Sequence, residues 1–125
     1  MLNKEQILAV HDLVTESVEV PEWLGCVLVR ALNGTDRDAF EQSIVDGKKT
    51  NLKNIRARLC ALCMVDDDGK RLFSDADVNA LGQKSASALD RVFKVAQKLN
   101  GLSPDDVKEL EKNSGSGLNA DSISD

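Results

Sequence analysis

Apolar and polar residues alternate between residues 15 and 20, which predicts a half-buried β-strand. A second extended run, residues 26–32, is rich in β-branched side chains and follows a Pro- and Gly-containing segment at residues 21–25. Two extended runs separated by this five-residue segment predict a β-hairpin with a longer loop.

Helical spacing dominates the rest of the N-terminal half. Asn3, with Gln6 three residues on, predicts a capped helix over residues 4–14. After a turn at Asn33, Thr35 is predicted to cap a second helix that stops at residues 46–47. A third helix is predicted over residues 52–63, because its apolar residues recur every three or four positions.

Two further helices are predicted from their caps. Ser74 begins a short one that ends at Gly82, and Ser85 begins a longer one that ends before Gly101. The longer helix is expected to bury Ala86, Leu89, Val92, Phe93, Ala96 and Leu99 and to expose Asp90, Lys94, Gln97 and Lys98.

The C-terminal part offers little to bury. Ser103 and Pro104 predict one more helix start, whose apolar residues are only Val107 and Leu110. Residues 114–125 are mostly Ser, Gly, Asn and Asp, which predicts a disordered tail. We therefore expect one domain, residues 1–113, of the α+β class: a mainly helical small domain with an N-terminal β-hairpin, followed by the disordered tail at 114–125.

Composition narrows the functional classes. The formal net charge is −5, which disfavours binding to nucleic acid phosphates. No apolar run approaches the roughly 20 residues that span a bilayer, so no membrane segment is expected. The apolar N-terminal residues are interrupted by charges, which is unlike a signal peptide and predicts a cytoplasmic protein. Three cysteines are an odd, low count that fits a reducing compartment.

Two motifs suggest metal or redox chemistry. Cys60 and Cys63 form a C-x-x-C, but it falls at the end of a helix, where the dipole does not favour a thiolate, and no second ligand pair exists for zinc. Residues 66–69, Asp-Asp-Asp-Gly, resemble part of a calcium loop, yet Met64 and Asp75 would occupy its first and twelfth positions. We interpret the cysteines as core residues and the acidic run as a solvated turn.

No catalytic constellation is evident. His11 is the only histidine, and the sequence contains no glycine-rich phosphate loop. We therefore predict no enzyme activity, no cofactor and no metal site.

Candidate partner-binding residues are Trp23, Arg30, Arg56 and Arg58. Trp23, beside Pro21 in the hairpin loop, is either an interface anchor or a lid on a small core. The arginines Arg56 and Arg58 lie in a basic stretch that begins at Lys48; a solvated helix face is the interpretation we favour, and a docking site for an acidic partner is the alternative. Arg30 lies within the second predicted strand, where it could also be simply an outward-facing strand residue.

Several blocks of the sequence, taken together in their order and spacing, resemble the small tail assembly chaperones of long-tailed bacteriophages. They are Val20-Pro21-Glu22-Trp23 with Gly25 and Val27–Arg30; Arg37–Glu41; Asn54–Leu59; Asp68–Phe73 with Asp75, Asp77-Val78 and Leu81-Gly82; and Leu110–Asn113. One departure is Leu24, where we expect a second glycine.

This resemblance implies a role in virion morphogenesis without incorporation into the virion. Such chaperones bind the tape measure protein in the host bacterial cytoplasm and help to recruit tail tube protein, in many relatives through a frameshifted longer form. Amphipathic helices that bury little alone can bind a client helix or self-associate, so a homo-oligomer is also expected. The alternative functions are a structural or tail-completion component of the virion and a small redox or metal protein that uses Cys60 and Cys63.

Overall fold

The computed structural model describes residues 1–102, and about half of these are helical. The elements follow in the order α1 (Lys4–Ala9), β1 (Thr15–Val20), η1 (Pro21–Trp23), β2 (Gly25–Arg30), α2 (Gly34–Ile44), β3 (Val45–Asp46), β4 (Lys49–Thr50), α3 (Ile55–Cys63), β5 (Met64–Val65), η2 (Asp75–Asp77), α4 (Val78–Leu81) and α5 (Ala86–Leu99). The predicted α+β class with an N-terminal hairpin is confirmed. The predicted last helix and the tail at 114–125 lie outside the described residues, and the domain boundary at 113 stays a prediction.

The hairpin forms because its alternation places valines on one face. β1 and β2 pair antiparallel from Thr15↔Arg30 to Val20↔Gly25, and Val18 and Val20 point into the core. β5 adds a third strand beside β2, in the order β1-β2-β5. The sequence did not predict the pairing of β5 with β2, since two residues are too few to show a period of two.

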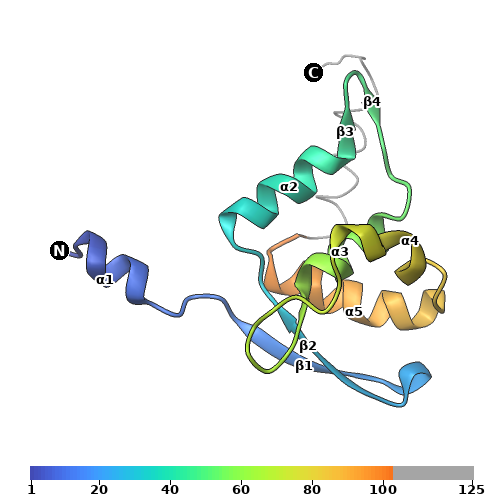
Figure 1. The fold of residues 1–125 in the computed structure, drawn as a ribbon, viewed down its shortest axis with the longest axis horizontal. Helices are drawn as coiled ribbons and strands as arrows, with labels where there is room; N and C mark the ends of the chain where they lie inside the picture. The colour runs from blue at the N-terminus through green and yellow to red at the C-terminus, as the bar shows by residue number, and fades with distance from the viewer. Residues whose placement is uncertain (103–125) are drawn as a thin grey trace.

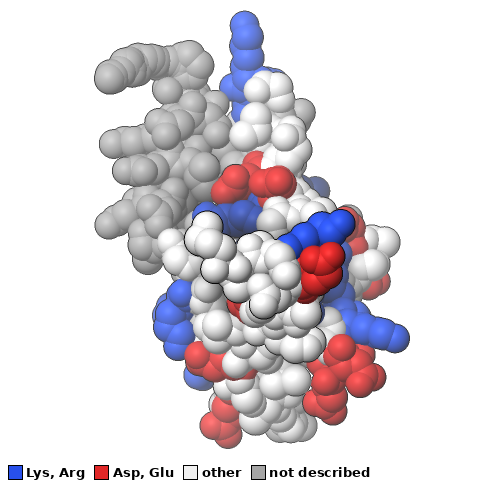
Figure 2. Space-filling model, turned by 90° about the vertical axis from the view of Figure 1, so that its left-hand side faces the viewer, with Lys and Arg blue, Asp and Glu red and all other residues white. Residues whose placement is uncertain are grey.

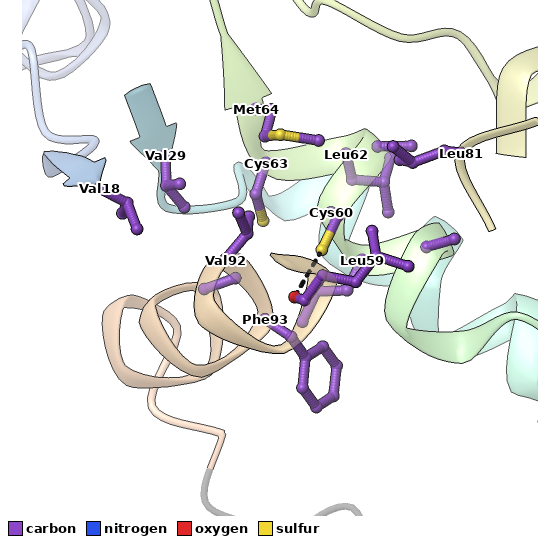
Figure 3. Close-up of a cluster of buried hydrophobic side chains, with 14 of the residues drawn as sticks. Val18, Val29, Leu59, Cys60, Leu62, Cys63, Met64, Leu81, Val92 and Phe93 are labelled. Carbon is purple, nitrogen blue, oxygen red and sulfur yellow. Dashed lines mark hydrogen bonds between the residues drawn. The ribbon is translucent and has the colours of Figure 1, made fainter. Parts of the chain in front are cut away.

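Helix α5 contacts both the sheet and α3, and the core forms where these elements meet. It lies against β1, β2 and α3, and α2 packs on α3 (Figure 1). Ser85 caps α5 by accepting a hydrogen bond from the Ala88 N–H, as predicted. Buried side chains from β2, α3, β5 and α5 meet in one cluster, which includes Val29, Leu59, Cys60, Cys63, Met64, Val92 and Phe93 (Figure 3).

Several details of the helices differ from the predictions, among them the start of α3, which lies at Ile55 rather than residue 52. α1 ends at Ala9 rather than residue 14, because the Ala31 N–H donates to the Val14 carbonyl and extends the hairpin ladder there. α2 is capped by Asn33 rather than Thr35, because the Asn33 side chain accepts from the Asp36 N–H at 2.7 Å. On α5, Gln97 is buried and Ala86 is exposed, the reverse of the prediction.

Two short elements link the larger ones. The β3–β4 hairpin turns at Gly47, whose φ of 63° is in the left-handed region that suits glycine. After β5, Arg71 pairs back to Val65 in a small antiparallel bridge. The Ser74 N–H donates to Asp77 Oδ2 at 2.8 Å, where the short helix was predicted to begin. Over residues 1–102, no helix is long and apolar enough to cross a bilayer.

Candidate functional site

The four predicted contact residues do not form one cluster. Trp23 lies on η1 at the hairpin tip, Arg30 ends β2, and Arg56 and Arg58 both lie on α3. Two of these residues line hollows in the surface: Arg58 lines a cavity, and Trp23 lines a groove. We call them the Arg58 cavity and the Trp23 groove.

The Arg58 cavity opens between α2, the segment that precedes α3, α3 itself and α4, and its volume is about 400 Å³. Its lining comprises Ala39, Phe40, Ser43, Asn51, Lys53, Asn54, Arg58, Leu62, Asp75, Val78 and Asn79. Phe40 and Leu62 belong to the buried core, so the cavity has an apolar base beneath a polar rim.

Arg58 holds the two sides of this cavity together. Its Nη1 donates to the Ser43 carbonyl at 2.7 Å and to Ser43 Oγ at 2.8 Å, and its Nη2 donates to the Asn51 carbonyl at 2.6 Å. Ser43 lies in the last turn of α2, where a cation is favourable for the helix dipole. Desolvation lowers the pKa of the guanidinium, whose Nε is buried with no hydrogen-bond partner among the described residues.

The rim of the cavity carries a cationic side chain that has no ion-pair partner among the described residues. Lys53 is exposed and forms no ion pair with any residue in 1–102, whereas Asp75, which also lines the cavity, pairs with Arg71 at 3.0 Å. An apolar base with a free ammonium group at the rim suits an amphipathic segment that carries a carboxylate beside its apolar side chains. Among the described lining residues there is no histidine or cysteine, and the one hydroxyl, Ser43 Oγ, is hydrogen-bonded to the Phe40 carbonyl and to Arg58.

The other two predicted arginines are held by contacts within the chain. Arg56 lies 3.6 Å from Asp90 and 5.8 Å from the centroid of the Phe93 ring, so it covers the edge of the α3–α5 contact. The Arg30 Nη1 donates to the Gly69 carbonyl at 2.7 Å and thereby fixes the acidic turn after β5. We therefore regard Arg30 first as a structural residue.

The Trp23 groove is nearly all carbon. It has a volume of about 220 Å³ and is lined by Trp23, Phe73, Ala80, Leu81 and Lys84, which come from η1, the segment after β5, α4 and the turn that follows. The chain has four aromatic residues; Phe40 and Phe93 are in the core, and the two half-buried ones both line this groove.

The hairpin tip is pinned to α5 beside this groove. The Arg91 Nε donates to Glu22 at 2.9 Å, and this hydrogen bond lowers the pKa of the Glu22 carboxyl. Leu24, the residue after Trp23, is 95% exposed and has a φ of 60°. A leucine in this left-handed conformation is strained, and here no packing compensates it.

The two cysteines of the C-x-x-C are buried in the cluster between α3 and α5, as interpreted from the sequence (Figure 3). Burial raises the pKa of Cys60 and of Cys63 to about 12, the opposite of what a reactive thiol needs. The Cys60 Sγ donates to the Leu89 carbonyl at 3.6 Å. These contacts oppose the redox hypothesis.

The acidic run is a turn. Asp66 Oδ1 accepts from the N–H groups of Asp68 and Lys70, at 2.8 and 2.9 Å. Within residues 1–102, no group of His, Cys, Asp or Glu side chains is arranged to hold a metal ion.

Sequence reasoning missed Phe73, Lys53 and Lys84 as site residues. Phe73 is fifty residues from Trp23 in the chain, and no spacing rule connects them. Composition offered one signal for Phe73. It is one of only four aromatic residues and lies in a short polar segment, so its ring needs a contact from a distant part of the chain.

Comparison with known proteins finds a matching family and a structure with a similar fold. The family model for phage tail assembly chaperones matches residues 6–113. The structure is similar to that of the tail assembly chaperone of bacteriophage HK97, with a TM-score of 0.57 and 20% sequence identity, over 76% of this chain and 94% of that one. A search among curated proteins finds no match. The likeness to the HK97 protein concerns the fold.

Proposed function

Because the chain belongs to the phage tail assembly chaperone family, we propose that it binds the tape measure protein and helps to recruit tail tube protein during tail morphogenesis. The observation that carries the proposal is the family match over residues 6–113. Membership gives a role in tail assembly, and it confirms the expectation that the chain is a chaperone and not an enzyme.

The Arg58 cavity is the surface that we assign to the client. Its base is apolar, its rim holds Lys53, which has no ion pair within residues 1–102, and its two walls are fixed by Arg58. An amphipathic client helix could place apolar side chains over Val78 and Leu62 and a carboxylate near Lys53. In this proposal Arg58 shapes the site and Lys53 meets the client.

We place this binding in the host bacterial cytoplasm, before the tail is complete. A chaperone that binds reversibly is expected to be absent from the mature virion. Mass spectrometry of purified virions checks this, and the presence of the chain in stoichiometric amounts would favour the alternative of a tail component.

Co-expression with the tape measure protein of the same genome tests the client. The expected result is that the tape measure protein becomes soluble and co-purifies with this chain. A tape measure protein that stays insoluble and unbound in the presence of the folded chain would contradict the proposal.

Matched charge reversals test the surface. Lys53→Glu is expected to weaken binding of the tape measure protein in the pull-down about tenfold or more, because it places a carboxylate beside the proposed carboxylate of the client. Lys48→Glu makes the same change on an exposed turn that does not line the cavity, and it should have little effect. Equal loss in both variants would show a general effect of charge and remove the cavity from the proposal.

A further inference from the structure

The N-terminal arm, residues 1–14, presents apolar side chains that the rest of the described chain does not cover. Helix α1 has a complete capping box between Asn3 and Gln6, but none of its residues is buried. Leu2 is 71% exposed, Ile7 56% and Leu8 78%. A helix of six residues is marginal in water without packing, and several large apolar side chains left exposed on one short segment indicate a surface that binds a partner.

A complementary surface exists on the same chain. The Trp23 groove is apolar, and Lys84 at its edge forms no ion pair with any residue in the described part of the chain. On α1, Glu5 lies three residues before Leu8 and therefore on the same helix face. Within residues 1–102 Glu5 also lacks an ion pair, so the arm carries the acidic group that the groove lacks.

The arm and the groove lie at opposite ends of the hairpin. The arm enters β1 at the open end of the hairpin, whereas Trp23 lies at the closed end, one six-residue strand away or about 20 Å (Figure 1). The bond from the Ala31 N–H to the Val14 carbonyl keeps the ladder running to residue 14, so the arm leaves the sheet in the direction away from Trp23. Figure 2, which views the molecule from the side of the arm, shows charged groups of both signs scattered over otherwise uncharged surface.

We propose that the arm of one copy docks into the Trp23 groove of a second copy of this chain. Leu8 enters the groove, and Glu5 lies beside Lys84 of the receiving copy. Each copy offers one arm and one groove, so two copies can exchange arms or further copies can add. The proposal goes beyond the client function and does not depend on the Arg58 cavity. A contact this small predicts a dissociation constant in the micromolar range or weaker, on the order of 1 µM to 1 mM.

Sedimentation velocity of the full chain over this concentration range tests the contact. The arm variant is Leu8→Asp, and the groove variant is Ala80→Asp, which charges the lining and gives Lys84 a partner within its own chain. Both residues are exposed, so neither change disturbs the core. Val45→Asp, on an exposed apolar residue outside both surfaces, is the matched control.

The expected result is concentration-dependent association of the unaltered chain and of Val45→Asp. Leu8→Asp and Ala80→Asp should each stay monomeric, with association at least about tenfold weaker. Their equimolar mixture should form a one-to-one dimer and nothing larger, because it retains one intact arm and one intact groove. Glu5→Lys and Lys84→Glu should each weaken association a few-fold and restore it when mixed.

Three outcomes would overturn the proposal. The first is that the unaltered chain stays monomeric at every concentration. The second is that Leu8→Asp and Ala80→Asp each self-associate as strongly as the unaltered chain. The third is that the equimolar mixture of the two variants remains monomeric. If the chain stays monomeric and Leu8→Asp instead loses the tape measure protein, the arm is a client contact and not a contact between copies.

Discussion

At the scale of single residues, Leu24 is the clearest case of a side chain that does not suit its backbone. Its φ of 60° costs roughly 1–2 kcal/mol for a non-glycine residue, and its side chain packs on nothing. Glycine loses about 0.5–1 kcal/mol through the entropy of the unfolded chain. Leu24→Gly should therefore raise the free energy of unfolding by about 0.5–1 kcal/mol, measured by urea denaturation.

Leu72 provides the control for Leu24. It is also an exposed leucine, but its φ is not positive, so Leu72→Gly relieves no strain and should lower the free energy of unfolding. Equal effects of the two changes would show that Leu24 is not strained.

The buried thiols of Cys60 and Cys63 predict how stability changes with pH. Burial raises the pKa of each to about 12 from an ordinary value of 9.0. Between pH 9 and pH 12 the unfolded chain loses protons that the folded chain keeps, so the free energy of unfolding falls as pH rises. Each thiol contributes up to about 1.4 kcal/mol per pH unit in this window.

Urea denaturation between pH 7.5 and 10.5 checks this dependence. Replacing Cys60 and Cys63 together by Ala should lower stability at neutral pH, through the space left in the core, but flatten the decline above pH 9. Cys26→Ala changes an exposed thiol and should leave the slope intact. An unchanged slope in the double variant would mean that the thiols do not govern the decline.

At the scale of elements, two arginines on α3 make different contributions. Arg58 donates three hydrogen bonds to α2 and to the segment before α3, whereas the exposed Arg56 has one long ion pair and a ring contact. Arg58→Met should lower the free energy of unfolding by about 1–3 kcal/mol, because it leaves carbonyl groups without donors. Arg56→Met should cost less than about 1 kcal/mol. Thermal denaturation of both variants separates the cases, and equal losses would contradict this account.

Elements with strong local signals were predictable from the sequence. The hairpin shows alternation around a Pro- and Gly-containing loop, and α5 shows a cap and a continuous apolar face. The pairing of β5 with β2 was not predictable, because two residues show no period and the two strands are more than thirty residues apart in the chain. Gln97 was assigned to the solvent by residue type, although its position four residues after Phe93 places it on the buried face.

The candidate sites were less predictable than the fold, because they depend on distant segments. The sequence singled out Trp23 and Arg58, but it could not pair Trp23 with Phe73 and Lys84. Nor could it show that Arg58 supports the wall of a cavity, or that Lys53 at the rim has no ion pair within residues 1–102. Self-contained motifs such as the capping box of Asn3 were read correctly, and the surfaces formed by tertiary contact were not.

At the scale of the whole molecule, the structure divides into a packed body and an unpacked arm. The core joins the sheet, α3 and α5, whereas no residue of α1 is buried. Amides in α1 should therefore exchange with solvent almost as fast as in an unfolded peptide when the chain is dilute, while amides in β2 and α5 should exchange only on global unfolding. Hydrogen exchange followed by mass spectrometry measures both regions in one experiment.

Measuring hydrogen exchange at several protein concentrations then distinguishes an arm that is exposed in a monomer from an arm that contacts a second copy. If the arm docks on a second copy, exchange at residues 4–9 should slow as the chain is concentrated, and Leu8→Asp should abolish this change without altering β2 or α5. Slow exchange of α1 in dilute solution would mean that the arm packs on its own chain, and it would contradict the division into body and arm. Fast exchange at every concentration would leave the division intact and count against the contact between copies.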